Sequence, residues 1–178
     1  QCAWQLLTQC CVPRATHVIR TLPPTQSADY VARHDLMLWE TTKQLLHTTH
    51  LDPALRTRAR RLASLPSRLG GLGLRSATRT RQAAYWASWA DTLPMMKTRN
   101  PDLAEGFLRQ LKEENAAVPA LEEAFKAEQE VRAAGYTNCP SWQELWEGKR
   151  PEQATETEPG EWKHGWQYFA ATRLETKF

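Results

Sequence analysis

The chain has 178 residues, 41% of them hydrophobic, and a formal net charge of +3 at pH 7. This is enough to bury a core, and no apolar run reaches the roughly 18 residues that a membrane-spanning helix needs. The charge is uneven, because residues 1–100 hold 14 Lys and Arg against 5 Asp and Glu, whereas residues 101–178 hold 9 against 15. Arg dominates the basic half and suits phosphate, so a polyanionic partner is favoured.

Helix starts are predicted where a capping side chain precedes a helical pattern, in two cases with proline at the first helical position. These N-cap candidates are Ser27, Asp52, Ser76, Asn100 and Ser141. Ser141 also forms a capping box with Glu144. The patterns predict helices near residues 1–11, 14–21, 27–49, 53–64, 76–92, 101–116, 119–134, 141–147 and 164–178.

Alternating β-branched runs are absent from the sequence, so we expect an all-α fold. It should be an irregular bundle of about seven to nine helices, with a glycine-rich turn and an appended C-terminal helix that is poorly packed in isolation. Residues 149–160 are acidic, bracketed by proline and devoid of large apolar groups, which is typical of a linker. The expected segments are a basic region at 1–100, an acidic region at 101–148, the linker at 149–160 and a truncated helical segment at 161–178.

The helix predicted from Pro53 is unusually basic. Leu55, Ala59 and Leu62 predict a narrow apolar stripe along it. Arginines flank this stripe on both sides, at Arg56, Arg58, Arg60 and Arg61. The same acid-free run continues with Arg68, Arg75, Arg79 and Arg81. A solvated face and a phosphate-binding face both fit the helix alone, and the length of the run favours phosphate.

The glycines of LGGLGLRS, namely Gly70, Gly71 and Gly73, resemble a phosphate loop only in part. A dinucleotide fingerprint needs another glycine, and a P-loop needs Lys before Ser or Thr. A tight structural turn is favoured. A further possibility is that free amides at the Ser76 helix start, beside Arg75, hold one backbone phosphate.

In the helix from Ser76, Trp86 and Trp89 are expected in the core rather than as base-stacking platforms.

Metal and catalytic patterns are weak. His47 and His50 are one turn apart without a carboxylate or Cys ligand nearby, which favours a solvated or capping role. His34 and Asp35 are helix neighbours and should point apart.

The four cysteines show neither zinc spacing nor a disulfide framework. We therefore expect reduced thiols and an intracellular location, nuclear or cytoplasmic. The chain starts with Gln1 and stops at Phe178 inside a helical pattern, so we expect a piece of a longer protein.

Four segments follow one another along the chain, and their order indicates a family resemblance: CVPRATHVIRTLPP, HDLMLWETTKQLL, LPSRLGGLGLRSA and AAYWASWADTL. This order resembles the region after the palm in reverse transcriptases of LINE-like retrotransposons that lack long terminal repeats. In that family the stretch similar to residues 10–50 forms the thumb, and the stretch similar to 65–93 is a connecting element. Residues 161–173, EWKHGWQYFAATR, resemble a segment further downstream.

The resemblance implies a non-catalytic part of an RNA-directed DNA polymerase. The family's palm carboxylates, which hold two magnesium ions and usually include an Asp-Asp pair, have no counterpart, since the chain contains no Asp-Asp. We therefore expect no activity from this chain alone, no cofactor in it, and magnesium only in a missing palm. The implied partners are an RNA/DNA template–primer duplex and the palm and fingers of the parent polymerase, with no membrane.

A thumb-like region would hold the duplex by its phosphates, without base readout. The residues expected to do so are Arg56, Arg58, Arg60, Arg61, Arg68, Arg75, Arg79 and Arg81, with Arg14 and Arg20 as weaker candidates. The alternative is a helical protein–protein interaction module with no nucleic-acid role, in which the basic half docks on the acidic half, within one chain or between two. The two hypotheses differ in whether the zone from Arg56 to Arg81 faces solvent or the glutamates of residues 113–130.

Overall fold

The structure is a computed structural model that describes residues 2–50, 52–114, 116–151 and 165–176. Regular structure in these residues is entirely helical, which confirms the all-α class. The helices are α1 (Cys2–Leu6), α2 (Ala15–Thr21), α3 (Pro24–Leu45), α4 (Pro53–Ser64), α5 (Ala77–Arg99), α6 (Pro101–Leu111), α7 (Pro119–Ala133), α8 (Trp142–Trp146) and α9 (Trp166–Thr176). A π-helical turn at Leu7–Cys11 and 3-10 turns at Val12–Arg14 and Ser67–Leu69 complete them. None of the described helices has both the length and the apolar character needed to cross a bilayer.

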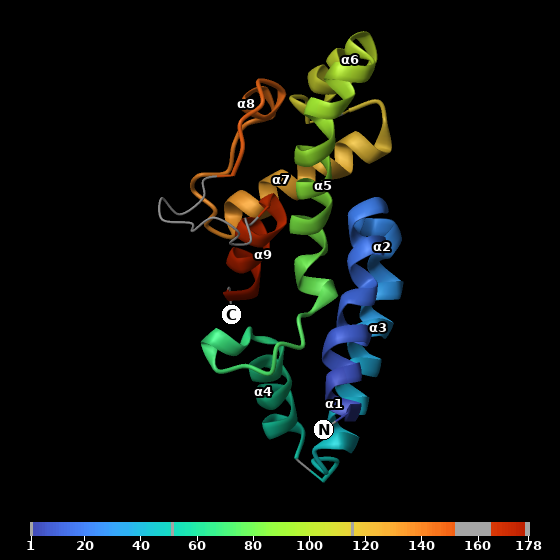
Figure 1. The fold of residues 1–178 in the computed structure, drawn as a ribbon, viewed down its shortest axis with the longest axis vertical. Helices are drawn as coiled ribbons and strands as arrows, with labels where there is room; N and C mark the ends of the chain where they lie inside the picture. Colours follow the sequence, from blue (N-terminus) through green and yellow to red (C-terminus); the bar gives the residue numbers. More distant parts are fainter. Residues whose placement is uncertain (1, 51, 115, 152–164, 177–178) are drawn as a thin grey trace.

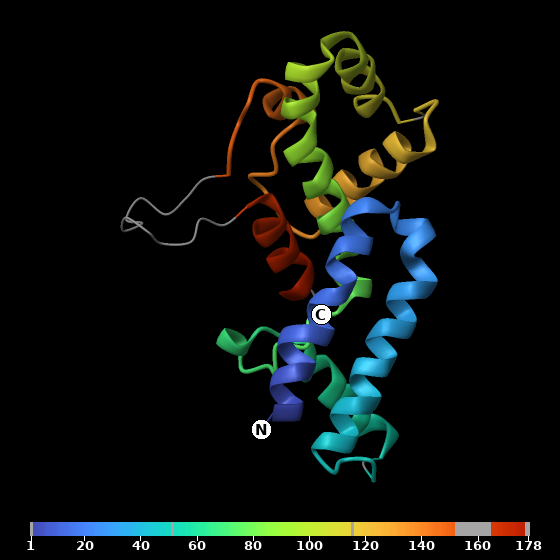
Figure 2. The same cartoon turned by 45° about the vertical axis from the view of Figure 1, so that its right-hand side comes forward.

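Helix α5 is the spine of the molecule. It runs along the long axis and packs against α2, α3, α6, α7, α8 and α9 (Figure 1). Helices α6 and α8 gather near one end, whereas α4 and the start of the chain lie near the other, as the turned view also shows (Figure 2). The arginine-rich helix α4 therefore lies near the end of the elongated body that is opposite α6 and α8.

Most of the predicted helix starts are confirmed by their hydrogen bonds. The side chains of Asp52, Ser76, Asn100 and Ser141 each accept a backbone N–H at a helix start, and Ser141 closes its capping box with Glu144. The prediction for Ser27 is wrong, because α3 begins earlier, at Pro24. Proline is preorganised for the first helical position, and Ser27 is instead buried with its hydroxyl donating to the Pro24 carbonyl at 3.3 Å.

Helix α5 is longer than the sequence pattern indicated. The predicted end at residue 92 is wrong, since the helix continues through Pro94 to Arg99. Proline removes one helical hydrogen bond and usually ends or kinks a helix. Here the residue before it, Leu93, is fully buried, so packing of α5 into the core holds the helix across the defect.

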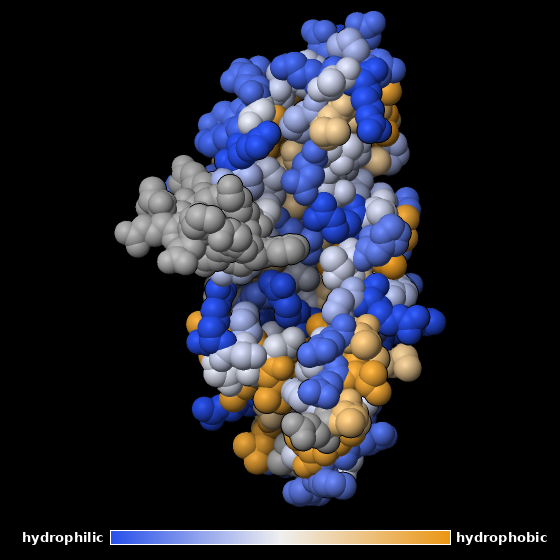
Figure 3. Space-filling view, viewed as in Figure 1, coloured by the Kyte–Doolittle hydropathy of each residue, from blue (hydrophilic) through white to orange (hydrophobic). Residues whose placement is uncertain are grey.

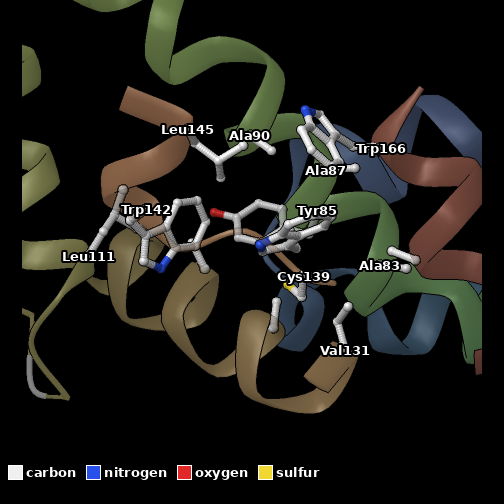
Figure 4. Packing of buried hydrophobic residues seen from close by; sticks show 14 of the residues in the cluster. Ala83, Tyr85, Ala87, Ala90, Leu111, Val131, Cys139, Trp142, Leu145 and Trp166 are labelled. Carbon is white, nitrogen blue, oxygen red and sulfur yellow. The ribbon is translucent and has the colours of Figure 1, made fainter. Parts of the chain in front are cut away.

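The main core forms around Trp86 of α5, whose side chain is fully buried, as predicted. Its ring meets Tyr136 and Trp166 edge to face, at centroid distances of 6.1 and 5.9 Å. Figure 4 shows side chains from α5, α8 and α9 converging in this core. Trp89 packs on the edge of the same cluster, edge-on to Phe107 at 6.0 Å, so both tryptophans serve packing.

The C-terminal helix belongs to this core. Trp166, Ala170 and Ala171 of α9 are buried in the cluster that holds Trp86. The expectation of a separate, appended helix is therefore wrong, because α9 buries Trp166 in the main core and packs against α5. The predicted linker at 149–160 lies outside the described residues from position 152 onward.

The capping box of α8 makes stability pH-dependent. Lys149 Nζ pairs with Glu144 Oε1 at 2.7 Å, and the Ser141 backbone N–H donates to Oε2 at 2.8 Å. The Lys149 hydrogen bond first, and then those from Ser141, lower the pKa of the Glu144 carboxyl from 4.5 to about 2. A carboxyl with a lowered pKa in the folded state contributes stability above its unfolded pKa and loses that contribution as pH falls through the folded value.

We expect Glu144→Gln to reduce the free energy of unfolding at neutral pH, and the difference from the parent to shrink as pH falls from about 4.5 toward 2. Urea unfolding followed by circular dichroism over this range measures both. Lys149→Met removes the main partner of the carboxylate and should reproduce the same pH dependence. A parent–variant difference that stays constant down to pH 2 would contradict the assignment.

Candidate nucleic-acid interface

Helix α4 carries the densest group of arginines, and its packed side differs from the predicted one. Ala63 is buried against Leu38 and Trp39 of α3, with Ala59 beside it. Leu55 and Leu62 are 53% and 50% exposed, so the predicted stripe of Leu55, Ala59 and Leu62 is wrong. The alanines Ala59 and Ala63 are therefore the α4 side chains that join the cluster around Leu38 and Trp39.

This orientation turns three arginines outward. Arg58, Arg60 and Arg61 are exposed, and their guanidinium groups have no hydrogen-bond or ion-pair partner within the described residues. Arg56 is half-buried on the packed side of the helix. Because Asp52 caps the helix with its carboxylate, the acid nearest in sequence is already engaged and leaves these three charges unneutralised.

The glycines after α4 form a compact turn that folds back on the helix end. Gly70 and Gly73 have φ values of +78° and +71°, a region that favours glycine. A Cβ at Gly71 would lie 2.0 Å from the Leu65 carbonyl oxygen, which leaves no room for a side chain. The Gly73 N–H donates to that same oxygen at 2.9 Å. The turn thus joins α4 to α5 with little freedom.

The amides at the start of α5 are occupied. Asp35 of α3 accepts from the Ala77 N–H at 2.9 Å through Oδ1, and from the Thr78 N–H at 3.0 Å through Oδ2. The Ser76 hydroxyl also donates to Oδ2, at 2.6 Å. The possibility that this helix start holds a backbone phosphate is therefore ruled out, because the Asp35 carboxylate already occupies the anion position.

Sequence reasoning missed Asp35 as a structural anion. It lies one turn from Val31 and from Leu38 on α3, both of them buried. An acid on an apolar helix face is costly to bury unless it finds partners. The position of Asp35 between buried apolar residues could therefore have predicted that a helix N-terminus or a cation binds its carboxylate.

Two of the candidate arginines are held by α9. Arg75 Nε pairs with Glu175 Oε1 at 2.6 Å, and this glutamate is only 3% exposed. Arg68 donates to the Tyr168 hydroxyl at 2.6 Å and lies 5.5 Å from the centre of its ring. These contacts connect the glycine turn to the C-terminal helix, so both side chains stabilise the fold.

The remaining candidates lie outside α4. Arg79 and Arg81 are half-buried on α5. Arg20 pairs with Asp91 at 2.9 Å and donates to Gln167 at 2.8 Å. Arg14 is exposed. The structure therefore places three exposed arginines on α4, and Arg79 of α5 lines the same cavity as two of them, Arg60 and Arg61. Contacts with α9 hold three other candidates, Arg20, Arg68 and Arg75.

The acidic half forms its own ion pairs. Glu122 pairs with Lys126 on α7, and Glu128 with Arg132 at 2.8 Å on the same helix. Figures 1 and 2 place α4 near one end of the molecule and α6 and α7 in the other half. The exposed arginines of α4 thus do not face the glutamates of residues 113–130 within one chain.

The surface around α4 is also apolar. Figure 3 shows hydrophobic residues gathered toward the end of the molecule where α4 lies. Large apolar side chains exposed on α4, on the end of α3 and on the glycine turn are Leu45, Leu46, Leu55, Leu62, Leu69 and Leu72. The arginines therefore stand among leucines, on a surface that combines charge with apolar area.

The described histidines were candidate metal ligands. Within the described ranges, no group of three or more His, Cys, Asp or Glu is placed to hold a metal ion. His47 follows the end of α3 with a φ of +53°, and the Thr48 N–H closes the turn on the Lys43 carbonyl at 2.9 Å. His34 Nδ1 lies 3.5 Å from Asp35 Oδ1, so the expectation that these neighbours point apart is wrong.

Comparison with known proteins finds no family model, no curated protein and no solved structure that matches the chain. The functional proposal therefore rests on the residues and contacts described above.

Proposed function

We propose that this chain binds duplex nucleic acid through backbone phosphates, with Arg58, Arg60 and Arg61 of α4 as the main contacts. On the resemblance noted in the sequence, the duplex is the template–primer of a LINE-like reverse transcriptase, and the chain is its thumb and connection region. The palm and fingers of that polymerase would supply the catalytic carboxylates and magnesium.

The observation that carries the proposal is the set of three exposed guanidinium groups on one helix, with no partner in the described residues. Arginines kept unpaired on a folded surface remain available for phosphate, and each phosphate contact releases counterions from the duplex. Arg68 and Arg75 are positioned differently, because Tyr168 and the buried Glu175 already engage them. In this proposal Arg68 and Arg75 stabilise the packing of the glycine turn on α9 and do not contact the duplex.

The proposal predicts weak binding with little sequence preference and a strong dependence on salt. Three phosphate contacts should give a log–log salt slope of about −3, since each contributes about −0.9. Arg58→Glu combined with Arg61→Glu should weaken binding of every sequence alike and flatten the slope to about −1. Fluorescence anisotropy with short labelled RNA–DNA hybrids, titrated at several salt concentrations, measures both quantities.

The matched control is Arg99→Glu combined with Arg109→Glu. Both residues are exposed, and they lie at the end of α5 and on α6, away from α4. This control makes the same change in net charge and should lower affinity far less than the α4 variant. An equal loss for both variants would show that only overall charge matters, and a slope near zero for the parent would refute the proposal.

A second candidate is a helical protein–protein interaction module, with α4 docking on a separate protein. The exposed Leu55 and Leu62 favour it, because apolar side chains beside arginines are typical of protein interfaces. A salt slope near zero in the anisotropy titration would favour this candidate over nucleic-acid binding.

A further inference from the structure

A cavity of about 410 Å³ lies between α3, α4 and the start of α5. Its volume falls in the range of small-molecule sites, which are usually apolar clefts with a few well-placed polar groups. Two of the three arginines proposed above to contact the duplex, Arg60 and Arg61, line this cavity, whereas its apolar walls have no part in that proposal.

The cavity has an apolar part and a cationic part. Leu38 and Trp39 of α3 line it together with Leu74, and all three are largely buried. Arg60 and Arg61 of α4 also line it, and neither guanidinium has a partner within the described chain. A ligand that fits both parts has a flat apolar body joined to an anion.

The acid among the lining residues does not cancel these charges. Asp35 is bound by the Ala77 and Thr78 amides and by the Ser76 hydroxyl. Its oxygens are therefore engaged at the helix start, where the positive end of the α5 dipole compensates them. The guanidinium groups of Arg60 and Arg61 remain available to an anion that enters from solvent.

We propose that this cavity binds one nucleoside phosphate, with the base against Leu38, Trp39 and Leu74 and the phosphate at Arg60 and Arg61. The choice of a nucleotide among aromatic anions rests on the proposed function, which brings nucleic acid to α4. The ligand is either a free nucleotide or an unpaired terminal nucleotide of a strand bound along the helix. Arg60 and Arg61 would then serve the cavity and the outer face together.

The first test uses adenosine 5′-monophosphate, adenosine and inorganic phosphate as separate probes in isothermal titration calorimetry. Thr78→Trp fills the cavity, because Thr78 lines it with an exposed side chain, while its backbone N–H to Asp35 is kept. Thr57→Trp adds the same bulk to an exposed position of α4 that does not line the cavity. Arg60→Gln removes one charge, and Arg99→Gln is its control.

The monophosphate should bind about tenfold more tightly than adenosine or inorganic phosphate, because only the monophosphate uses both parts of the cavity. Thr78→Trp should abolish this binding and Arg60→Gln should weaken it about tenfold, whereas both controls bind like the parent. The proposal is overturned if the monophosphate does not bind at millimolar concentration. It is also overturned if Thr78→Trp binds as well as the parent, or if inorganic phosphate binds equally tightly. Circular dichroism confirms that each variant is folded.

A second set of duplexes separates the two sources of the ligand and the two proposals. A duplex with a one-nucleotide 5′-phosphorylated overhang should bind more tightly than a blunt duplex if the site takes a strand end, and Thr78→Trp should erase that preference. Monophosphate binding without an overhang preference supports a free nucleotide. Salt-dependent blunt-duplex binding without monophosphate binding overturns the cavity proposal alone. Monophosphate binding without duplex binding overturns the proposed function and supports the cavity.

Discussion

Trp86→Ala is expected to lower the free energy of unfolding by about 3–5 kcal/mol, the range seen when a buried aromatic side chain is cut to alanine. The side chain is fully buried and touches rings from two other segments, Tyr136 and Trp166. Its removal leaves a cavity at the point where α5 meets α9, and the surrounding helices relax only in part. Urea unfolding followed by far-UV circular dichroism measures the change.

Trp89→Ala is the matched control, because it removes the same side chain from the same helix at the edge of the core. Trp89 is only half-buried, so its loss should cost clearly less than the loss of Trp86. Equal costs for the two variants would contradict the packing described for α5. Trp86→Phe keeps an aromatic ring in place and should recover a large part of the loss.

Asp35→Ala should lower the free energy of unfolding by about 2–4 kcal/mol, since it removes a helix cap and leaves buried donors unpaired. The carboxylate serves the Ala77 and Thr78 amides and the Ser76 hydroxyl at once, and the residue is only 8% exposed. Thermal unfolding and amide hydrogen exchange at the start of α5 report the global and the local effect.

Asp29→Ala is the control for this variant, because Asp29 lies on the same helix and is exposed. It should change stability little. Asp35→Asn retains one carbonyl oxygen as an acceptor and should fall between the parent and the alanine variant. Fast exchange of the Ala77 and Thr78 amides in the parent protein would show that the cap is not formed.

Local chemistry made much of the fold predictable. An N-cap depends on neighbouring residues, so Asp52, Asn100 and Ser141 were identifiable from sequence, and the structure places each at a helix start. The end of α5 was not predictable in this way. Whether a helix survives Pro94 depends on how firmly Leu93 is packed, which the residues around it do not reveal.

The candidate site was predictable in composition but not in arrangement. The run of arginines is visible in the sequence, yet Arg75 meets Glu175 and Arg68 meets Tyr168 across the length of the chain. Such partners depend on the tertiary fold. The buried face of α4 was not predictable for the same reason, since Ala63 is buried with Leu38 and Trp39 of another helix while Leu55 and Leu62 are exposed.

The packing of α9 on α5 also affects the order of events during folding. Helix α5 is synthesised before α9, and the two are separated in sequence by α6, α7 and α8. Long-range contacts of this kind form late in folding, because the intervening chain must first be brought into place. Until then Trp86 lacks the Trp166 ring that covers it in the native state. The time that α9 takes to pack on α5 therefore determines how long a newly synthesised chain exposes an aromatic surface to other unfolded chains.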